Sequence, residues 1–387
     1  MKHAMSYDNA VISQLLKLIP RYEFESLASE YHRGRSFRKA SRLFQFVTMA
    51  IAQLSGRNFL RDIVENITAQ VHRLYHLGSS KSSRTILSRI YEGKPYGLYE
   101  ALCGHLFAGC QNVAPRHNFR FTNPLYSLDA NRINLCLDDC PCANFCSTKG
   151  ARKLLVGLNY SGYLPKFMRI TEGETYDAKA AKRLTLSPGS ILVFDKAYND
   201  CEWYNQLENK GIFFVTRLKS NAVYCIIERQ ETVKSKGITS DQIIEFTGAV
   251  RAKRFPLPLR RIGYRDQEIV KHCVFLTNNM KLSSKTIADI YKSRWQVKLF
   301  FKWIKQNLKI KSFVGATKNA ILTHIWITIC VYLLLTLTKF QSNLSLSLQQ
   351  VIKILEINLF ERGDLMTLLR GDPPVYKPHD SLQAKLF

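Results

Sequence analysis

The spacing of the apolar residues changes near residue 115, and this change most constrains the fold. Before it, apolar residues recur at three- and four-residue intervals, as in 15–19 and 44–54, which predicts helices. After it come short apolar runs typical of strands. Helical spacing returns in 201–209 and again from about residue 284. The order predicts helices first and then a mixed α/β sheet domain.

The expected strands are short and lie close together along the chain. They cover 125–129, 133–137, 154–158, 167–170, 191–194, 212–216 and 273–277. We therefore divide the chain into five segments: a helical N-terminal domain (1–115), the first part of the sheet domain (116–219), a β-rich insertion (220–280), helices that complete the sheet domain (281–340) and a helical tail (341–387).

The charge balance points to a polyanionic partner. The chain has 56 Lys and Arg against 30 Asp and Glu, a formal net charge of +26. Nucleic acid is the simplest such partner, and a generic basic protein or contact with an anionic membrane are the alternatives. The N-terminal residues lack the apolar core of a secretory signal, and with 10 cysteines we expect free thiols in a reducing, cytoplasmic and nucleoid-associated setting.

One apolar stretch, Ile321 to Leu337, imitates a membrane span. It contains His324 and several threonines, and it is shorter than the roughly 20 clean apolar residues that a span needs. We interpret it as a buried core helix and expect no membrane partner.

Residues 59–90 read as helix, turn, helix. Ser82 or Ser83 could cap the second helix, which then displays Arg84 and Arg89. In a basic protein such a helix could enter a DNA groove. An ordinary helical hairpin explains the pattern equally well.

Two acids follow predicted core strands, Asp129 and Asp195. If these strands are neighbours in the sheet, both carboxylates point at one place. Carboxylate oxygens suit Mg²⁺, and two such ions about 4 Å apart can hold the attacking and leaving oxygens of a phosphodiester. Their position alone is also consistent with two acids that only end strands and have no catalytic role.

Four polar residues share one face of a predicted helix. Tyr291, Arg294, Lys298 and Lys305 are spaced so that their side chains form a single stripe, called the signature stripe below. Arginine and lysine in such a stripe suit a phosphate backbone, although a solvated basic face is the ordinary alternative. We expect Trp295, Leu299 and Trp303 to face the core.

These residues resemble a known family. The segment from Tyr291 to Lys305 is similar to the Y-x-x-R-x-x-x-E-x-x-x-x-x-x-K signature of the IS-four family of DDE insertion-sequence transposases. The run 194–198 resembles the family's D-R-G-Y motif, and Ser127-Leu128-Asp129 resembles its first aspartate strand. Its N-terminal helices, including 75–78, resemble the helical domain often found ahead of that catalytic core.

The resemblance implies a ribonuclease-H-like catalytic domain with a β-rich insertion before the last catalytic helix. It implies DNA cleavage and strand transfer with two Mg²⁺ ions held by Asp, Asp and Glu. Asp129 and Asp195 would be the metal ligands, and Tyr291, Arg294 and Lys305 would hold DNA. The partners would be the terminal inverted repeats of the element and target DNA, bound by a homodimer in a synaptic complex.

The chain departs from this pattern at the third carboxylate. Lys298 occupies the glutamate position, and Lys196 and Ala197 replace Arg and Gly of the second motif. An ammonium beside two metal ions would repel them by several kcal/mol, on the order expected at low effective dielectric. From Val270 to Val351 the only acid is Asp289, on the opposite side of the helix from Lys298. We therefore expect poor cleavage or none.

Two other interpretations stay open. The chain could be a non-catalytic DNA-binding remnant that still recognises element ends, or, less in keeping with the motifs, a metal nuclease unrelated to transposition. Separately, four cysteines within a short span could hold Zn²⁺, although their spacing is not a usual zinc-finger pattern. They are Cys136, Cys140, Cys142 and Cys146.

Overall fold

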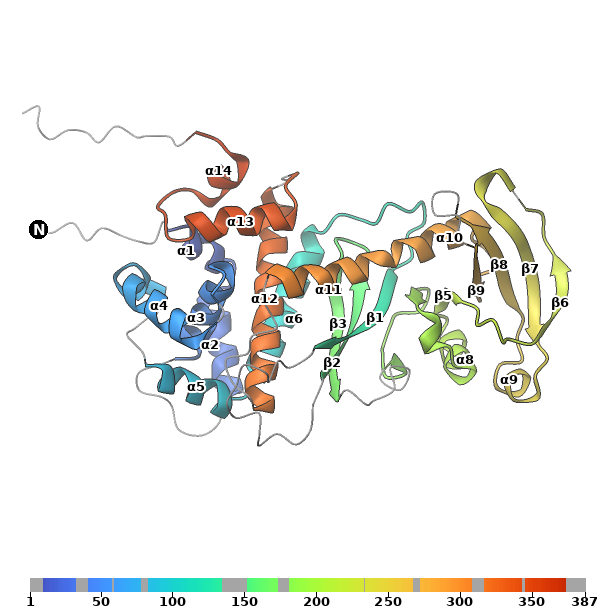
Figure 1. Cartoon of the computed structure of the whole chain (residues 1–387), viewed down its shortest axis with the longest axis horizontal. Coiled ribbons are helices and arrows are strands. Elements are labelled where there is room, and N and C mark those ends of the chain that lie inside the picture. The colour runs from blue at the N-terminus through green and yellow to red at the C-terminus, as the bar shows by residue number, and fades with distance from the viewer. Residues whose placement is uncertain are drawn as a thin grey trace, which may run out of the picture. The chain divides into compact units, whose positions relative to one another are not determined.

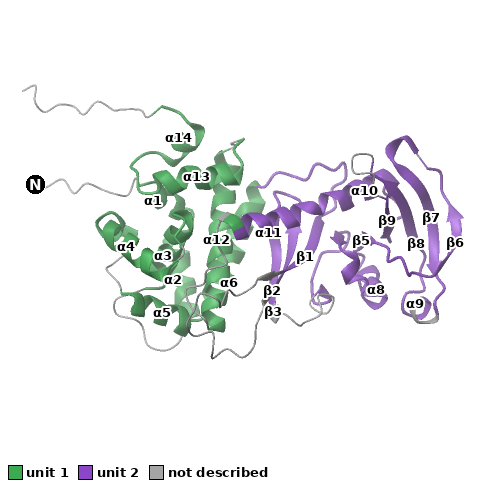
Figure 2. Ribbon diagram, viewed as in Figure 1, with its two compact units in different colours: residues 1–113, 306–387 green, residues 114–305 purple. Residues whose placement is uncertain are grey.

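The computed structural model describes residues 10–32, 41–57, 59–77, 83–133, 152–172, 181–232, 234–266, 272–307, 317–342 and 345–373. The chain forms two compact units, which Figure 2 shows in green and purple. The helical unit takes residues 1–113 together with 306–387, and the sheet unit takes residues 114–305. The helical unit thus draws on both ends of the chain, while the sheet unit includes the whole segment from 220 to 280.

The helical unit confirms the all-helical N-terminal region (Figure 1). Its described helices are α1 (Val11–Leu16), α2 (Arg21–Glu30), α3 (Arg42–Leu54), α4 (Leu60–Leu74), η2 (Tyr75–Leu77), α5 (Arg84–Gly93), α6 (Gly97–Val113), α12 (Lys318–Ser342), α13 (Leu348–Asn358) and α14 (Leu365–Arg370). The hydroxyl of Ser83 accepts a hydrogen bond from the Ile86 N–H at 3.3 Å. This cap satisfies one of the orphan N–H groups at the start of α5, as one of the two serine candidates predicted.

Helix α12 is the apolar stretch that imitates a span. It is the one helix among the described residues that is long and apolar enough to cross a membrane, and its apolar window is 100% buried inside the protein. His324 is buried too, and burial lowers its pKa to about 4, so it is neutral at physiological pH. The prediction of a buried core helix is confirmed.

The described residues of the sheet unit form one mixed sheet of nine strands, seen in Figure 1. The order is β3-β2-β1-β4-β5-β9-β8-β7-β6. The strands are β1 (Leu125–Ile133), β2 (Arg152–Asn159), β3 (Leu164–Glu172), β4 (Ile191–Phe194), β5 (Phe213–Arg217), β6 (Tyr224–Arg229), β7 (Ile238–Phe246), β8 (Leu259–Arg265) and β9 (His272–Thr277).

The first five strands have the arrangement expected of a ribonuclease-H-like domain. β1, β4 and β5 run parallel, and β2 and β3 add to β1 as antiparallel strands. β6 to β9 then extend the same sheet from β5 through antiparallel pairs. The β character of 220–280 is confirmed, and a short helix that we did not expect, α9 (Ala249–Arg254), lies within it.

Helices cover both faces of this sheet. On one face, Trp203 and Tyr204 of α8 (Cys201–Asn209) pack against Phe194 and Phe214. On the other, Ile287 and Tyr291 of α10 (Ser284–Ser293) belong to a second core cluster. The strands between them are buried on both sides, which explains their continuous apolar runs. Helix α11 (Trp295–Asn307) continues almost directly from α10 (Figure 1).

Candidate active site

Strand register brings the two predicted acids together. In the parallel pair of β1 and β4, Leu128 is the partner of Phe194. Asp129 and Asp195 each follow directly, so they lie at the same level of two neighbouring strands. Asp129 is still within β1, where its partner on β2 is Val156. The two buried strands hold both acids at one point on the sheet.

Asp195 ends its strand as the cap of a single helical turn. Its Oδ1 accepts a hydrogen bond from the Ala197 N–H at 3.2 Å, at the start of η4 (Lys196–Tyr198). Among the described residues the only non-glycine residue with positive φ is Tyr163, so the backbone at Ala197 does not require glycine. The alanine in place of the motif glycine is therefore compatible with this turn.

Arg294 lies between the two carboxylates. It joins α10 to α11 in a right-handed helical conformation and is 7% exposed. Its Nη1 lies 3.5 Å from Asp129 Oδ2, and its Nη2 lies 3.4 Å from Asp195 Oδ2. The Tyr291 hydroxyl, one turn earlier, donates to the same Asp195 oxygen at 3.5 Å. The helix thus delivers two residues of the signature stripe to the acids.

A second arginine, Arg217, was not predicted for this site. In the parallel pair of β4 and β5, Val193 is the partner of Val215, so Arg217 lies level with Asp195. Its Nη2 donates to Asp195 Oδ2 at 3.1 Å, and its guanidinium lies 5.9 Å from the centre of the Tyr291 ring. The available signal was an arginine directly after a predicted core strand.

The two carboxylates differ in their protonation behaviour. Burial raises the pKa of Asp129, and the opposing charges of Arg294 and Lys298 only partly offset it. Burial also acts to raise the pKa of Asp195, but Arg294, the Ala197 N–H and Arg217 outweigh it, so this pKa is below its usual value. Asp195 is therefore the more firmly ionised of the pair.

The remaining residues of the signature stripe are lysines. Lys305 Nζ donates to Asn131 Oδ1 on β1 at 2.6 Å. Lys298 is exposed, and its Nζ lies 5.6 Å from the centre of the Trp295 ring. The positive charge of Lys298 lowers the pKa of Asp129, so this lysine lies within electrostatic range of the acid site.

The core face of α11 differs from our expectation. Trp295 is 59% exposed and Leu299 is 39% exposed, while Trp303 is only half-buried. The buried residues of the helix are Val297, Phe300, Phe301 and Ile304. Helical spacing correctly gives which residues share a face, but the buried face of α11 is the one with Val297, Phe300, Phe301 and Ile304.

The residues of this site do not make up a three-carboxylate metal site. The described residues contain no group of three or more His, Cys, Asp or Glu placed to hold an ion. Asp129 and Asp195 offer oxygen ligands, but Arg294 contacts an oxygen of each. Charged lysine has only donors and cannot replace the third carboxylate. Asp129 and Asp195 could supply part of the ligand set of a divalent ion. Lys298 supplies a positive charge where a third carboxylate ligand would be needed.

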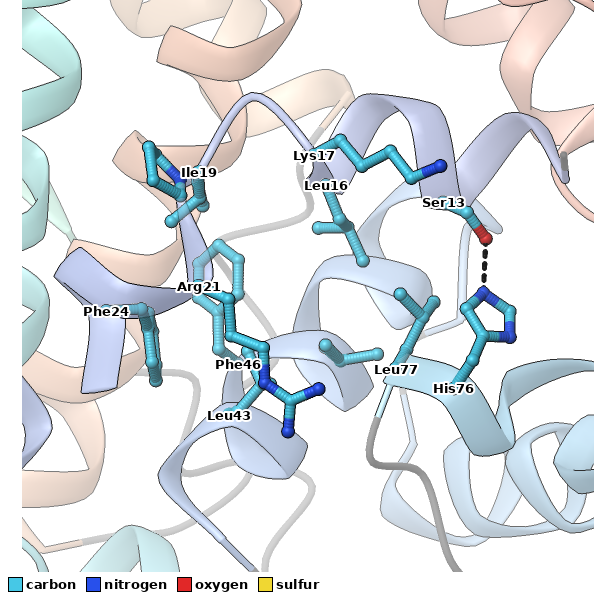
Figure 3. Close-up of a pocket in the computed structure, with 12 residues that line it drawn as sticks. Ser13, Leu16, Lys17, Ile19, Arg21, Phe24, Leu43, Phe46, His76 and Leu77 are labelled. Atoms are coloured by element: carbon cyan, nitrogen blue, oxygen red, sulfur yellow. Dashed lines mark hydrogen bonds between the residues drawn. The ribbon is translucent and has the colours of Figure 1, made fainter. Parts of the chain in front are cut away.

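Other candidates lie elsewhere in the chain. Arg84 and Arg89 are exposed on α5 of the helical unit. The same unit contains a cavity of about 250 Å³ between α1, α2, α3 and η2 (Figure 3). Its lining is mainly apolar and includes a hydrogen bond of 2.7 Å between Ser13 Oγ and His76 Nε2. None of its lining residues is an acid. The cysteines Cys136, Cys140, Cys142 and Cys146 lie outside the described residues.

The fold and the paired acids define an enzyme class, and comparisons with known proteins agree. Residues 125–334, more than half of the chain, match the family model "Transposase DDE domain". Residues 7–80 match a domain of unknown function, DUF4372. The chain belongs to the DDE transposase family, whose members are insertion-sequence transposases. Family membership implies a divalent metal ion.

Several relatives carry transposase names. The protein y4zB of Sinorhizobium fredii is 30% identical over 220 residues, which are 56% of this chain and 61% of that protein. The transposase named for insertion sequence element IS5377, from Geobacillus stearothermophilus, is 28% identical over 72% of this chain and 74% of its own length. A solved piggyBac transposase synaptic complex with hairpin DNA is 10% identical with a TM-score of 0.46, covering 96% of this chain and 82% of that chain.

Proposed function

We propose that this protein is an insertion-sequence transposase that binds the inverted repeats of its element and target DNA, with DNA cleavage and strand transfer impaired by Lys298. The observation that carries the proposal is the meeting of Asp129 and Asp195 at Arg294, on the helix that also presents Lys298. Family membership and the net charge of +26 support a DNA substrate.

The residues of the site form two groups, an acidic pair and the basic residues around it. Asp129 and Asp195 are the ligands that a divalent ion would use, and such an ion would stabilise charge on the reacting phosphate. Arg294 and Lys305 are placed to hold the phosphate backbone, because guanidinium and ammonium groups match its oxygens. Tyr291 offers a hydroxyl beside them.

The helical unit is the second proposed contact with DNA. Arg84 and Arg89 are both exposed on α5, which follows α4 as the second helix of a helix-turn-helix pattern. An exposed basic helix can enter a major groove and contact phosphates or base edges. Element ends would be bound by a homodimer in the synaptic complex, in a cytoplasmic, nucleoid-associated setting.

Lys298 is the reason to expect impaired cleavage. A glutamate at this position would bring a third carboxylate to the acids, whereas lysine brings a positive charge. That charge disfavours divalent ions at the site by repulsion, and the effect is large wherever water is excluded. The described part of the chain has no other acid that completes the set.

Restoring the glutamate tests the proposal directly. The assay follows nicking of duplexes that carry the inverted repeats from the DNA flanking the coding region, with Mg²⁺ or Mn²⁺. We expect no more than trace nicking by the purified chain and at least about a hundredfold more by Lys298→Glu, since a step of about 2.7 kcal/mol in the barrier gives that factor. The matched control is Lys302→Glu, the same charge change at an exposed lysine one turn along α11.

Three outcomes separate the alternatives. Cleavage gained only in Lys298→Glu supports an intact transposase fold that lacks one ligand. Robust nicking by the unaltered chain contradicts the impairment. End-specific binding without cleavage in any variant favours the second candidate, a non-catalytic remnant that recognises element ends, for which Lys298 is again the motivating observation.

A further inference from the structure

Positive charges outnumber the acids at the candidate active site. Arg217 and Arg294 contact the two carboxylates of Asp129 and Asp195, and the charge of Lys298 acts on Asp129, so three positive charges act on two carboxylates. The formal sum is 3 − 2 = +1. With glutamate in place of Lys298 the same sum would be 2 − 3 = −1. The lysine therefore changes the sign of the site from one that attracts a cation to one that attracts an anion.

Arg294 and Arg217 also have N–H groups that do not donate hydrogen bonds to Asp129 or Asp195. Nε and Nη1 of Arg294 and Nε of Arg217 are buried and make no hydrogen bond with any described residue. Nη1 of Arg294 lies 3.5 Å from Asp129, which is an ion pair without good hydrogen-bond geometry. Arg294 as a whole is 7% exposed. Buried donors of this kind favour an incoming acceptor, and phosphate oxygens fit a guanidinium fork well.

Lys298, one helical turn after Arg294, adds an exposed ammonium whose charge acts on Asp129. Among the described residues it makes no ion pair, and its nearest described aromatic neighbour is the exposed Trp295 ring. An ammonium held above a ring keeps its outer N–H groups directed to solvent. A phosphate oxygen approaching Asp129 and Arg294 from solvent would meet this charge.

We propose that Arg217, Arg294 and Lys298 form a phosphate site that binds a DNA backbone phosphate directly, with no divalent ion between the acids and the DNA. The site rests on the proposed function, because it requires that DNA reaches these acids. Arg294 and Arg217 donate to the phosphate oxygens, and Lys298 supplies the charge that a metal ion supplies to a three-carboxylate site. Divalent ions then compete with the bound state instead of supporting it.

Binding of DNA with and without metal tests this site. The probe is a fluorescent duplex carrying the flanking inverted repeats, followed by anisotropy in EDTA and in Mg²⁺ at equal ionic strength. We expect the unaltered chain to bind at least as tightly in EDTA as in Mg²⁺. Lys298→Glu should bind about tenfold more weakly in EDTA, as loss of one charged phosphate contact predicts, and Mg²⁺ should restore most of that affinity.

Lys302→Glu is the matched control, because it makes the same charge change at an exposed lysine one turn further from Arg294 along the same helix. It should lose only a few-fold affinity and show no rescue by Mg²⁺. In a second measurement without DNA, Mn²⁺ binding followed by electron paramagnetic resonance should be tighter for Lys298→Glu than for the unaltered chain or for Lys302→Glu. Thermal unfolding of each variant checks that it is folded.

The outcomes keep the two proposals apart. A requirement for Mg²⁺ by the unaltered chain, or equal behaviour of the two glutamate variants, would overturn the phosphate site while leaving DNA binding intact. Absence of DNA binding by every folded variant would overturn the proposed function itself.

Discussion

Two arginine–carboxylate clusters lie in the same sheet unit, and they are built differently. Arg260 on β8 holds Asp241 on β7 through two hydrogen bonds of 2.6 and 2.8 Å, and both side chains are at most 6% exposed. Arg294 reaches Asp129 and Asp195 only at 3.5 and 3.4 Å, with carboxylates that are 19% and 24% exposed. The first cluster is a bidentate, buried ion pair, called the closed pair below. The second, called the open cluster, has longer distances between its charged atoms and carboxylates that are partly exposed to solvent.

The difference indicates which cluster is structural and which can exchange partners. Arg260 also donates to the Leu282 carbonyl, just before the Ser283 cap of α10. The closed pair therefore ties the antiparallel extension of the sheet to the start of the helix that carries Tyr291 and Arg294. The open cluster of Arg294, Asp129 and Asp195 lies at the other end of that helix, where both carboxylates are partly exposed and two donor nitrogens of Arg294 make no hydrogen bond with a described residue.

The largest expected effect comes from breaking the closed pair. Arg260→Met leaves Asp241 buried without its partner, and we expect the free energy of unfolding to fall by about 3–5 kcal/mol. The same substitution at the open cluster, Arg294→Met, should cost only about 1 kcal/mol, since longer and more exposed contacts contribute less and Arg217 still holds Asp195. Urea denaturation of both variants measures the comparison.

A double variant controls for the closed pair. Replacing both partners, Arg260→Met with Asp241→Leu, removes the stranded charge and should recover most of the lost stability. Equal losses for Arg260→Met and Arg294→Met would contradict the distinction between a structural pair and an exchangeable one.

A smaller effect is expected on the pH dependence of stability, through the titration of Asp129 and Asp195 in the open cluster. The folded pKa of Asp195 lies below its unfolded value, so its contribution to stability is present above the unfolded pKa and is lost as pH falls through the folded one. Asp129 has the opposite sign: its pKa is raised, so its contribution is present at low pH and is lost as pH rises through the folded pKa.

Carboxyl ¹³C NMR can follow this pair, with assignments from Asp129→Asn and Asp195→Asn. We expect Asp129 to titrate at the higher pH in the unaltered chain. In Arg294→Met both transitions should move upward, because the main opposing positive charge is lost from each. If the titration curves of the unaltered chain and of Arg294→Met are the same, the guanidinium does not lie between the two acids in solution.

Much of the fold and half of the site could be predicted from sequence. Helix 201–209 and the Ser83 cap depend on local patterns, and the structure has both. The meeting of Asp129 and Asp195 followed from acids placed after apolar strands, together with the condition that those strands are neighbours, which β1 and β4 are. Local sequence patterns and this one condition on strand order were therefore enough to predict that the two acids meet.

The rest depends on long-range register and packing. Arg217 reaches Asp195 only because Val193 and Val215 are partners, and a shift of one residue would turn it to the other face. The prediction that Trp295 and Leu299 lie in the core was wrong, because helical spacing cannot tell which flank of a stripe is buried. In the same way, β-rich sequence in 220–280 gives no sign that its strands continue the catalytic sheet.

The smallest expected effect on stability concerns Tyr291. Its hydroxyl donates to Asp195 at 3.5 Å, the limit of a hydrogen bond, whereas its ring packs 4.8 Å from the Phe275 ring centre. Tyr291→Phe keeps the ring and removes only a hydrogen bond at the distance limit, so the free energy of unfolding should fall by about 0.5 kcal/mol. Burial raises the pKa of this tyrosine, so at neutral pH its O–H is a donor and can serve a phosphate oxygen as well as Asp195. Affinity for the element-end duplex should therefore fall several-fold in Tyr291→Phe while stability holds, and a loss of stability above about 1 kcal/mol would place this hydroxyl in a closed network like that of Arg260.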